Sequence, residues 1–338
     1  ASDDANRTTV TTYTPDGAVG TLVAWNAATG NQTTTYTYGT TLSDSAVASS
    51  QLLRSVAYPD SSGGSDVVAY TYNRQGQQTT ITDQNGTVRT FEYDNLGRLT
   101  HDRVTTLGSG VDGAVRRLST AYEVRGLVES LTSYDNAAVG SGTVLNEVLR
   151  EYNDFGQATK SYQEHAGSVN TSTSPHVEYD YDDGSNNTIR MTQINYPSGS
   201  ALHYNYGSTI DDSASRVFQI EEPDGFVWKA LVEYDYLGLG TAVLVDYVDN
   251  SGTTSATVLQ YTLVGDTMNN DPDTGDIYKG LDRFGRVKDC RWMQNGASGF
   301  QDVARIEYGY NRASSRIWRH DPIAQANSAQ YDELYSYD

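Results

Sequence analysis

The sequence predicts an all-β protein made of consecutive antiparallel β-hairpins. The first observation is a short motif that recurs along the chain, in which a tyrosine is followed four residues later by a glycine. The second is the composition, with 31 Gly, 26 Tyr against 6 Phe, and 7 Pro in 338 residues, which is typical of many short strands joined by turns. The third is that no segment keeps a helical period; the nearest, residues 137–150, is interrupted by Gly140 and Gly142.

The best copy of the motif lies at residues 91–100. Period-two alternation places Tyr93 at the end of an amphipathic strand. Asp94 can accept hydrogen bonds from the turn backbone, and Gly97 can adopt a positive φ. Leu99 then restarts the apolar pattern on the returning strand. The stretch therefore predicts a hairpin with a loop slightly longer than two residues.

The same pattern recurs from residue 72 to the end of the chain. Tyr72 and Tyr93 are 21 residues apart, and loop insertions lengthen the later steps, as expected for a repeat array. Residues 310–315 form a degraded copy, and residues 331–335 form a copy cut short by the chain end. The predicted structural positions are Tyr72, Gly76, Tyr93, Asp94, Gly97, Arg98, Leu99, Tyr122, Gly126, Tyr152, Gly156, Tyr234, Asp235, Gly238 and Gly285.

The motif Tyr-Asp-x-x-Gly-Arg-Leu at residues 93–99, with a glycine turn and a short strand before it, resembles the YD repeat of the RHS family. That family includes bacterial polymorphic-toxin shells, the BC component of insecticidal toxin complexes, and animal teneurins. The resemblance extends from Tyr72 to the end and more weakly from Trp25. It implies one spiralling sheet, an arc or part of a hollow β-cocoon or solenoid.

On this basis residues 1–338 are expected to form a single repeat array. Residues 1–66 would carry degenerate repeats, residues 67–176 the best-formed ones, and residues 177–338 further degenerate repeats with the last incomplete. Three insertions rich in small or polar residues interrupt the middle section: Leu107–Gly113, Ala137–Gly142 and His165–Pro175.

The tyrosine excess favours a single-layer sheet that is wet on both faces, because tyrosine combines an apolar ring with a polar tip. The alternative is a tyrosine-rich sandwich surface. In the single-layer interpretation the rings of neighbouring hairpins would stack in a row, and the motif glycines would permit the turns. The expected row is Tyr72, Tyr93, Tyr122, Tyr152 and Tyr234.

The formal net charge of −20 disfavours binding to nucleic acid and favours cationic partners, such as a cationic cargo. No apolar run reaches the roughly 18 residues of a membrane span. The single cysteine, Cys290, excludes an internal disulfide and is compatible with secretion. Together with the resemblance, this predicts a secreted or cell-surface protein.

No residue pattern indicates catalysis or a cofactor. None of the five histidines has the spacing of a zinc site, and no G-x-S-x-G elbow or phosphate-binding loop is present. Lys288 and Arg291 could lower the pKa of Cys290, but a lone cysteine in a β-repeat is expected to be inert. Asp271, Asp273 and Asp276 form a candidate calcium site, with an acidic turn as the alternative.

The resemblance implies that the chain is a structural wall of a shell that encloses or presents a C-terminal cargo domain. In toxin members a self-cleaving core with an Asp-Pro-x-Gly-Leu-type motif follows the array, and neither Asp271-Pro272 nor Asp321-Pro322 matches it. No catalytic residue is therefore carried over, and the chain is not expected to be an enzyme.

Two alternatives remain open. One is an adhesion or recognition module that binds through the three insertions. The other is a subunit of a self-assembling extracellular β-fibre. Tyr331-Asp332 is expected to open a hairpin that lacks its second strand, which leaves an open sheet edge. The missing strand would come from the remainder of a larger RHS-type chain or from a neighbouring copy.

Overall fold

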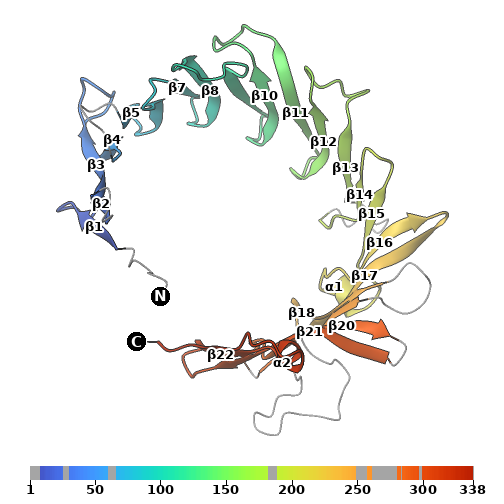
Figure 1. Cartoon of the computed structure of the whole chain (residues 1–338). Helices are drawn as coiled ribbons and strands as arrows, with labels where there is room; N and C mark the ends of the chain where they lie inside the picture. The colour runs from blue at the N-terminus through green and yellow to red at the C-terminus, as the bar shows by residue number, and fades with distance from the viewer. Residues whose placement is uncertain are drawn as a thin grey trace. The chain divides into compact units, whose positions relative to one another are not determined.

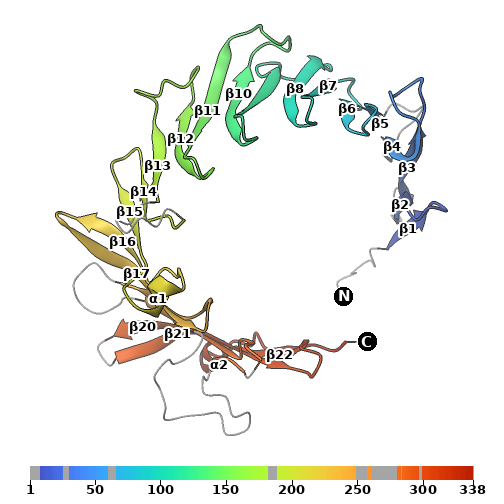
Figure 2. The same ribbon diagram turned by 180° about the vertical axis from the view of Figure 1, so that it is seen from behind.

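The computed structural model describes residues 8–25, 30–59, 66–181, 189–248, 257–260, 280–282, 284–296 and 299–337. The chain divides into two compact units, residues 1–176 and 177–338, which are described separately below. Within each unit the elements follow one another in chain order (Figures 1 and 2).

In the first unit, each strand pairs antiparallel with the next one along the chain, from β1–β2 to β11–β12. Successive connections therefore lie alternately at the two ends of the strands, as in a meander. The strands are β1 (Thr9–Tyr13), β2 (Val19–Ala24), β3 (Gln32–Thr40), β4 (Ser49–Ala57), β5 (Val67–Tyr72), β6 (Gln78–Thr82), β7 (Val88–Tyr93), β8 (Leu99–Thr106), β9 (Arg117–Tyr122), β10 (Val128–Tyr134), β11 (Val144–Tyr152) and β12 (Ala158–Glu164).

The second unit continues with the same consecutive antiparallel pairing, from β13–β14 to β22–β23. Its strands are β13 (His176–Asp180), β14 (Gln193–Asn195), β15 (Ala201–Asn205), β16 (Gln219–Asp224), β17 (Val227–Leu237), β18 (Thr241–Tyr247), β19 (Thr257–Gln260), β20 (Asp289–Gly296), β21 (Gly299–Tyr310), β22 (Arg316–His320) and β23 (Glu333–Leu334). The two short helices among the described residues are α1 (Ile210–Ser213) and α2 (Pro322–Ala326). The prediction of an all-β chain of consecutive antiparallel hairpins is confirmed.

Few side chains are fully buried, as expected for a sheet without a second layer. In the described part of the chain no second sheet covers the strands (Figure 1). Among the residues that the structure describes, the buried hydrophobic ones are Val56, Tyr72, Tyr162, Val243, Leu281 and Met293. Contacts between neighbouring hairpins, rather than a central core, must therefore hold each unit together. No helix in the described residues has the length and apolar character to span a membrane.

Candidate functional site

The repeated turn is built by one carboxylate and one glycine. In the hairpin β7–β8, Asp94 Oδ1 accepts hydrogen bonds from the backbone N–H groups of Leu96 and Arg98, each at 2.9 Å. The guanidinium Nε of Arg98 donates to Asp94 Oδ2 at 2.7 Å. Gly97 has φ +81°, a conformation that side chains with a Cβ rarely adopt. Asp282 and Arg286 repeat the same arrangement in the second unit.

In two turns that begin with asparagine, the residue four positions later is glutamine. Asn73 Oδ1 accepts from the backbone N–H groups of Gln75 and Gln77, and Asn73 Nδ2 donates to Gln77 Oε1 at 2.8 Å. Asn153 and Gln157 make the same contacts. A charged pair and a neutral pair thus satisfy the same turn, so the two positions are matched in hydrogen-bonding capacity.

These hydrogen bonds lower the pKa of the turn carboxylates. For Asp94 the largest cause is the backbone N–H of Arg98, and the Arg98 side chain and the Leu96 N–H act in the same direction. Burial opposes the shift at Asp282, but hydrogen bonds from Arg286 and the Phe284 N–H outweigh it, and the pKa of Asp282 is also lowered. Both groups are therefore held as carboxylates at neutral pH.

A tyrosine stands just before each of four turns in the first unit, where a β-bulge shifts the register by one residue. In the first unit Tyr72 pairs with Gln78, Tyr93 with Leu99, Tyr122 with Val128 and Tyr152 with Ala158. The extra residue lies on the returning strand, at Thr79, Thr100, Glu129 and Thr159, and it increases the local twist of the hairpin.

The tyrosine hydroxyl connects each hairpin to the one before it. Tyr93 donates to the carbonyl of Gln78, Tyr122 to that of Leu99, and Tyr152 to that of Val128, at 2.8, 2.9 and 2.7 Å. Each acceptor is the residue that pairs with the preceding motif tyrosine. We call this chain of contacts the tyrosine ladder; its members include Tyr72, Tyr93, Tyr122, Tyr152, Tyr206, Tyr236, Tyr310 and Tyr337.

An arginine stacks on the ladder ring at several steps. Arg98 lies 4.3 Å from the ring centroid of Tyr122, and Arg286 lies 4.6 Å from that of Tyr310. In both cases the arginine directly precedes the carbonyl that accepts the tyrosine hydroxyl. The arginine therefore stabilises its own turn by its hydrogen bond to the aspartate, and it contacts the next hairpin by stacking on the tyrosine ring. Arg190 and Arg216 occupy the same position against Tyr206 and Tyr236.

The expected row of stacked tyrosines differs from the structure. Among the described residues no ring pair joins two of the five tyrosines predicted for that row. Equivalent positions on successive hairpins are two strand spacings apart, about 10 Å, which is too far for direct ring contact. The hydroxyl and the arginine cross that distance instead.

The copy predicted at Tyr234 is displaced by two residues. Tyr236, not Tyr234, follows the bulge and donates to the carbonyl of Val217 at 2.7 Å. Tyr234 stacks on Tyr236 with ring centroids 6.2 Å apart. Asp235 pairs with Leu244 inside β17 and so does not cap a turn. Gly238 does lie in the connection to β18, with φ +64°.

The remaining predicted glycines lie in turns, and the degraded copies are better formed than expected. Ser314 adopts φ +64° at the glycine position, and Asn311 caps that turn as Asn73 does. In the last copy Tyr337, not Tyr331, donates to the carbonyl of Arg316 at 2.7 Å. Gly76, Gly126, Gly156 and Gly285 have φ of +79°, +94°, +79° and +73°.

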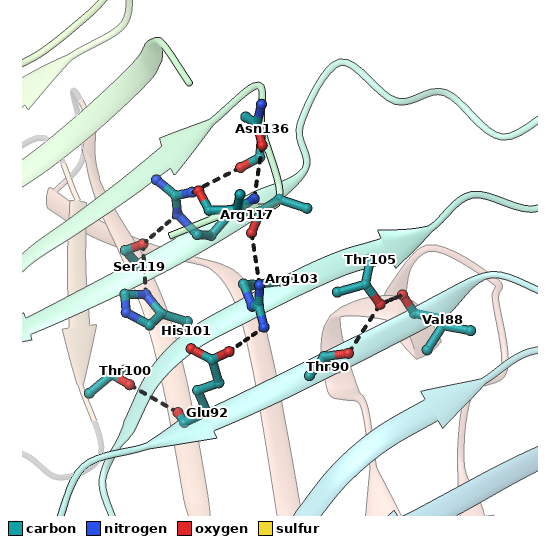
Figure 3. A network of polar contacts seen from close by, with 12 residues as sticks. Val88, Thr90, Glu92, Thr100, His101, Arg103, Thr105, Arg117, Ser119 and Asn136 are labelled. Carbon is teal, nitrogen blue, oxygen red and sulfur yellow. Dashed lines mark hydrogen bonds and ion pairs between the residues drawn. The ribbon is translucent and has the colours of Figure 1, made fainter. Parts of the chain in front are cut away.

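A second polar network joins β7, β8, β9 and the insertion after β10 (Figure 3). The side chain of Arg117 is buried, with 3% exposure, and its guanidinium lies 3.8 Å from the ring centroid of Tyr134. It donates to Ser119 Oγ at 3.1 Å and to the carbonyls of Asn136 and Ser141 at 3.0 and 3.1 Å. The Arg117 guanidinium also donates a hydrogen bond to the carbonyl of Ala138. Arg117 therefore organises the backbone of residues 136–141.

Arg103 lies directly opposite Arg117 in the β8–β9 register. Two like charges in this position repel each other unless other groups compensate. Arg103 donates to the carbonyl of Ala137 at 3.2 Å and forms an ion pair with Glu92. The carbonyl dipoles of the insertion and one carboxylate thus offset the repulsion (Figure 3). No motif in the sequence marks this pair; the signal for it is the cationic Arg116-Arg117, which follows shortly after the insertion Leu107–Gly113.

The three insertions lie at the same ends of the strands in the first unit. They form the connections β8–β9, β10–β11 and β12–β13, whereas the predicted turns after Tyr72, Tyr93, Tyr122 and Tyr152 lie at the opposite ends of the strands. Specific contacts tie each insertion down. Asn85 Nδ2 donates to the Ser109 carbonyl at 2.8 Å, and Ser174 Oγ donates to Glu164 Oε2 at 2.7 Å.

Other reactive groups make structural contacts. His101 Nδ1 lies 3.0 Å from Ser119 Oγ, and burial lowers the pKa of His101. Burial, aided by Asp289, raises the pKa of the Cys290 thiol, which opposes the activation that its basic neighbours could provide. The described residues hold no cluster of three metal-ligating side chains. The calcium candidates Asp271, Asp273 and Asp276 lie outside the described residues.

Comparisons with known proteins agree with this geometry. The family model described as "RHS Repeat" matches residues 67–109. A search of curated proteins found no match. The crystal structure of TcdB2-TccC3-TEV is similar to this chain at 11% identity and a TM-score of 0.50, over 98% of this chain and 16% of that one. The Tc holotoxin pore of Photorhabdus luminescens is similar at 10% identity and a TM-score of 0.50, over 93% of this chain and 15% of that one. The chain thus spans about one sixth of the solved chains whose fold it shares.

Proposed function

We propose that this RHS-repeat chain forms part of the wall of a shell that encloses or presents a cargo domain. In this proposal the chain performs no reaction itself. Its partners are the remainder of a larger RHS-type polypeptide, or neighbouring copies that pair with its open sheet edges. The assembly acts outside the cell or at its surface.

The observation that carries the proposal is the tyrosine ladder. A wall must transmit stability from each hairpin to the next without a core behind it, and each ladder step does this with a hydroxyl–carbonyl bond. The same step recurs in both units although the loops between the hairpins vary in length. Such nearest-neighbour coupling suits an extended structure that surrounds a space better than a globular enzyme domain.

The charge of the chain supports a cationic cargo. A net charge of −20 on a wall attracts basic polypeptides and repels nucleic acids. The resemblance to the RHS family implies that the cargo follows on the C-terminal side. The similar solved chains are about six times longer, which leaves room for further wall and cargo in a protein of that type.

Electron microscopy combined with light-scattering mass, at several protein concentrations, tests the wall proposal. We expect particles of constant monomeric mass with a curved outline, because a twisted sheet coils. Filaments that lengthen with concentration would contradict it and support a self-assembling fibre.

Surface recognition is a second candidate function, favoured because the three insertions lie at the same ends of the strands. Arg117 and Arg103 hold one of these insertions in a defined conformation, which suits a binding surface. The test replaces all three insertions with tight Asn-Gly turns in the same chain. Loss of binding to cell surfaces would support this function, and unchanged binding would exclude it.

A further inference from the structure

His320 joins the hairpin β21–β22 to the short helix α2. It is the last residue of β22 and stands in register with Glu307 of β21. Its Nδ1 lies 3.0 Å from Glu307 Oε2, and its Nε2 lies 3.1 Å from Gln325 Oε1 in α2. A neutral imidazole carries one N–H group, and an imidazolium carries two. Only the imidazolium can therefore donate to both oxygens at the same time.

The groups around the ring favour the imidazolium. Glu307 faces it from β21, and Asp332 acts on it from the segment that follows α2. The hydrogen bond to Glu307 is the largest cause of a raised pKa at His320; Gln325 and Asp332 act in the same direction, and burial opposes them. The side chains of His320 and Glu307 are 31% and 29% exposed, so solvent screens this pair only in part.

Glu307 lies between two cationic side chains. Its Oε1 lies 2.9 Å from the guanidinium of Arg305, which also lies 2.7 Å from the carboxylate of Asp289 on β20. Arginine keeps its charge at every pH at which the chain is folded, whereas histidine changes its charge near neutral pH. His320 is therefore the member of this group that can respond to a change from acidic to alkaline conditions.

The segment of residues 321–334 is held by polar contacts rather than by burial. The backbone N–H of Asp321 donates to Asp332 Oδ1 at 3.0 Å, so the segment closes on itself. Arg319 lies 4.0 Å from the carboxylates of Asp321 and Glu333. The helix α2 lies beside β21, and none of its residues is buried (Figures 1 and 2). At the end of the segment, β23 pairs with β22 over two residues.

We propose that His320 is a pH-sensitive latch, which holds residues 321–334 against β21 while its ring is protonated and loosens them when the ring is neutral. A neutral ring keeps one N–H group, so either Glu307 or Gln325 loses its donor unless the Gln325 amide turns to donate instead. In both cases the ionic attraction to Glu307 and Asp332 disappears. Because β23 ends this segment, its loosening also exposes the edge of β22 that β23 covers.

The latch closes in acid and opens in base. The pKa of His320 is raised in the folded chain, so the stabilisation is complete below the unfolded value of about 6.5. It is lost as pH rises through the folded value. The latch goes beyond the wall proposal, because it acts on one segment whether or not the chain encloses a cargo.

Hydrogen exchange of the full chain, measured between about pH 5.5 and about pH 9, reports the protection of residues 321–334 once it is corrected for the intrinsic pH dependence of exchange. NMR of the histidine rings follows His320 in the same samples, with its signal assigned by its loss in His320→Gln. We expect protection to fall by about threefold or more, with a midpoint at the titration of His320. Glu307→Gln keeps an oxygen acceptor but removes the carboxylate, so it should move both midpoints to lower pH.

The matched control is His203→Gln, because His203 pairs in register with Glu221 on the paired strands β15 and β16 of the same unit. It should leave the pH dependence of residues 321–334 unchanged, whereas His320→Gln should abolish it. Wild-type protection that stays constant while His320 titrates would overturn the proposal, and so would equal pH dependence in the wild type and His320→Gln. The first comparison uses the wild type alone, so it decides the matter even where a variant folds poorly.

Discussion

The guanidinium of Arg98 lies 4.3 Å from the ring centroid of Tyr122, although these residues belong to successive hairpins. The carbonyl next to that arginine, on Leu99, accepts the Tyr122 hydroxyl at 2.9 Å. Arg98 also donates to Asp94 in its own turn. One arginine therefore stabilises its own turn and contacts the next hairpin. A substitution in one turn should accordingly alter the stability of the neighbouring hairpin as well.

Removal of one ladder hydroxyl should weaken the first unit measurably. Tyr122→Phe keeps the ring on Arg98 but leaves the Leu99 carbonyl without its donor, which should lower the free energy of unfolding by about 1 kcal/mol. Urea unfolding followed by circular dichroism measures the change. The control is Tyr13→Phe, since the Tyr13 side chain is 65% exposed, and its effect should stay within about 0.5 kcal/mol. Equal effects at the two sites would show that the ladder bond is not stabilising.

A side chain at Gly97 should strain its turn. Gly97 has φ +81°, and an added Cβ would lie 3.1 Å from Gln77 Nε2, which donates to the Gly97 carbonyl. Gly97→Val should therefore lower the free energy of unfolding by more than about 1 kcal/mol. Gly240→Ala is the comparison, because no atom lies within 4 Å of its added Cβ and its φ is not positive. An unchanged melting temperature for Gly97→Val would contradict this turn assignment.

The stability of the repeated turns should fall in acid. The pKa of Asp94 is lowered, chiefly because the Arg98 N–H donates to its carboxylate. A lowered pKa in the folded state means that this stabilisation is complete above the unfolded value of about 3.9 and is lost as pH falls through the folded value. Urea midpoints measured between neutral pH and about pH 2.5 should show wild type and Asp94→Asn converging at the acid end. A constant difference across that range would contradict the assignment.

At alkaline pH the ionisation of partly buried tyrosines should destabilise the folded chain. Burial raises the pKa of Tyr72, Tyr93 and Tyr236 above the usual value of about 10. Their contribution is complete below pH 10 and is lost as pH rises through the folded value, because the unfolded chain ionises more easily. Tyrosinate absorbance and circular dichroism, recorded together during an alkaline titration, should show part of the ionisation coinciding with unfolding. Complete ionisation of a folded chain would contradict the burial of these hydroxyls.

Loss of Arg117 should release the insertion after β10. Arg117→Ala leaves the carbonyls of Asn136 and Ser141 without donors, which should cost about 2 kcal/mol or more. Hydrogen exchange should increase at residues 135–143 before it increases elsewhere in the first unit. The comparison is Arg89→Ala, which removes an exposed ion pair with Asp102 and should cost no more than about 1 kcal/mol. Unchanged exchange in the insertion would show that Arg117 does not organise it.

Local turn chemistry explains why the sequence was sufficient for the fold class. Asp94, Gly97 and Arg98 make their turn contacts within five residues, so their spacing alone predicts the hairpin. The same local rules placed Gly76, Gly126, Gly156 and Gly285 in turns. The copy at residues 234–239 was predicted two positions early, because Tyr234 and Tyr236 both have an aromatic ring on the same strand, and only the bulge at Val243 of β18, opposite Tyr236, distinguishes them.

The sequence by itself determined the repeat, the turn residues, the antiparallel hairpins and the acidic character of the chain, because each depends on neighbours in the chain or on composition. The tertiary structure decided which tyrosine belongs to the ladder, that Arg98 stacks on Tyr122, and that Arg103 and Arg117 meet at one insertion. These contacts join residues 14 or more positions apart through strand register and bulges. Register is a property of two paired strands, so neither strand read alone contains it.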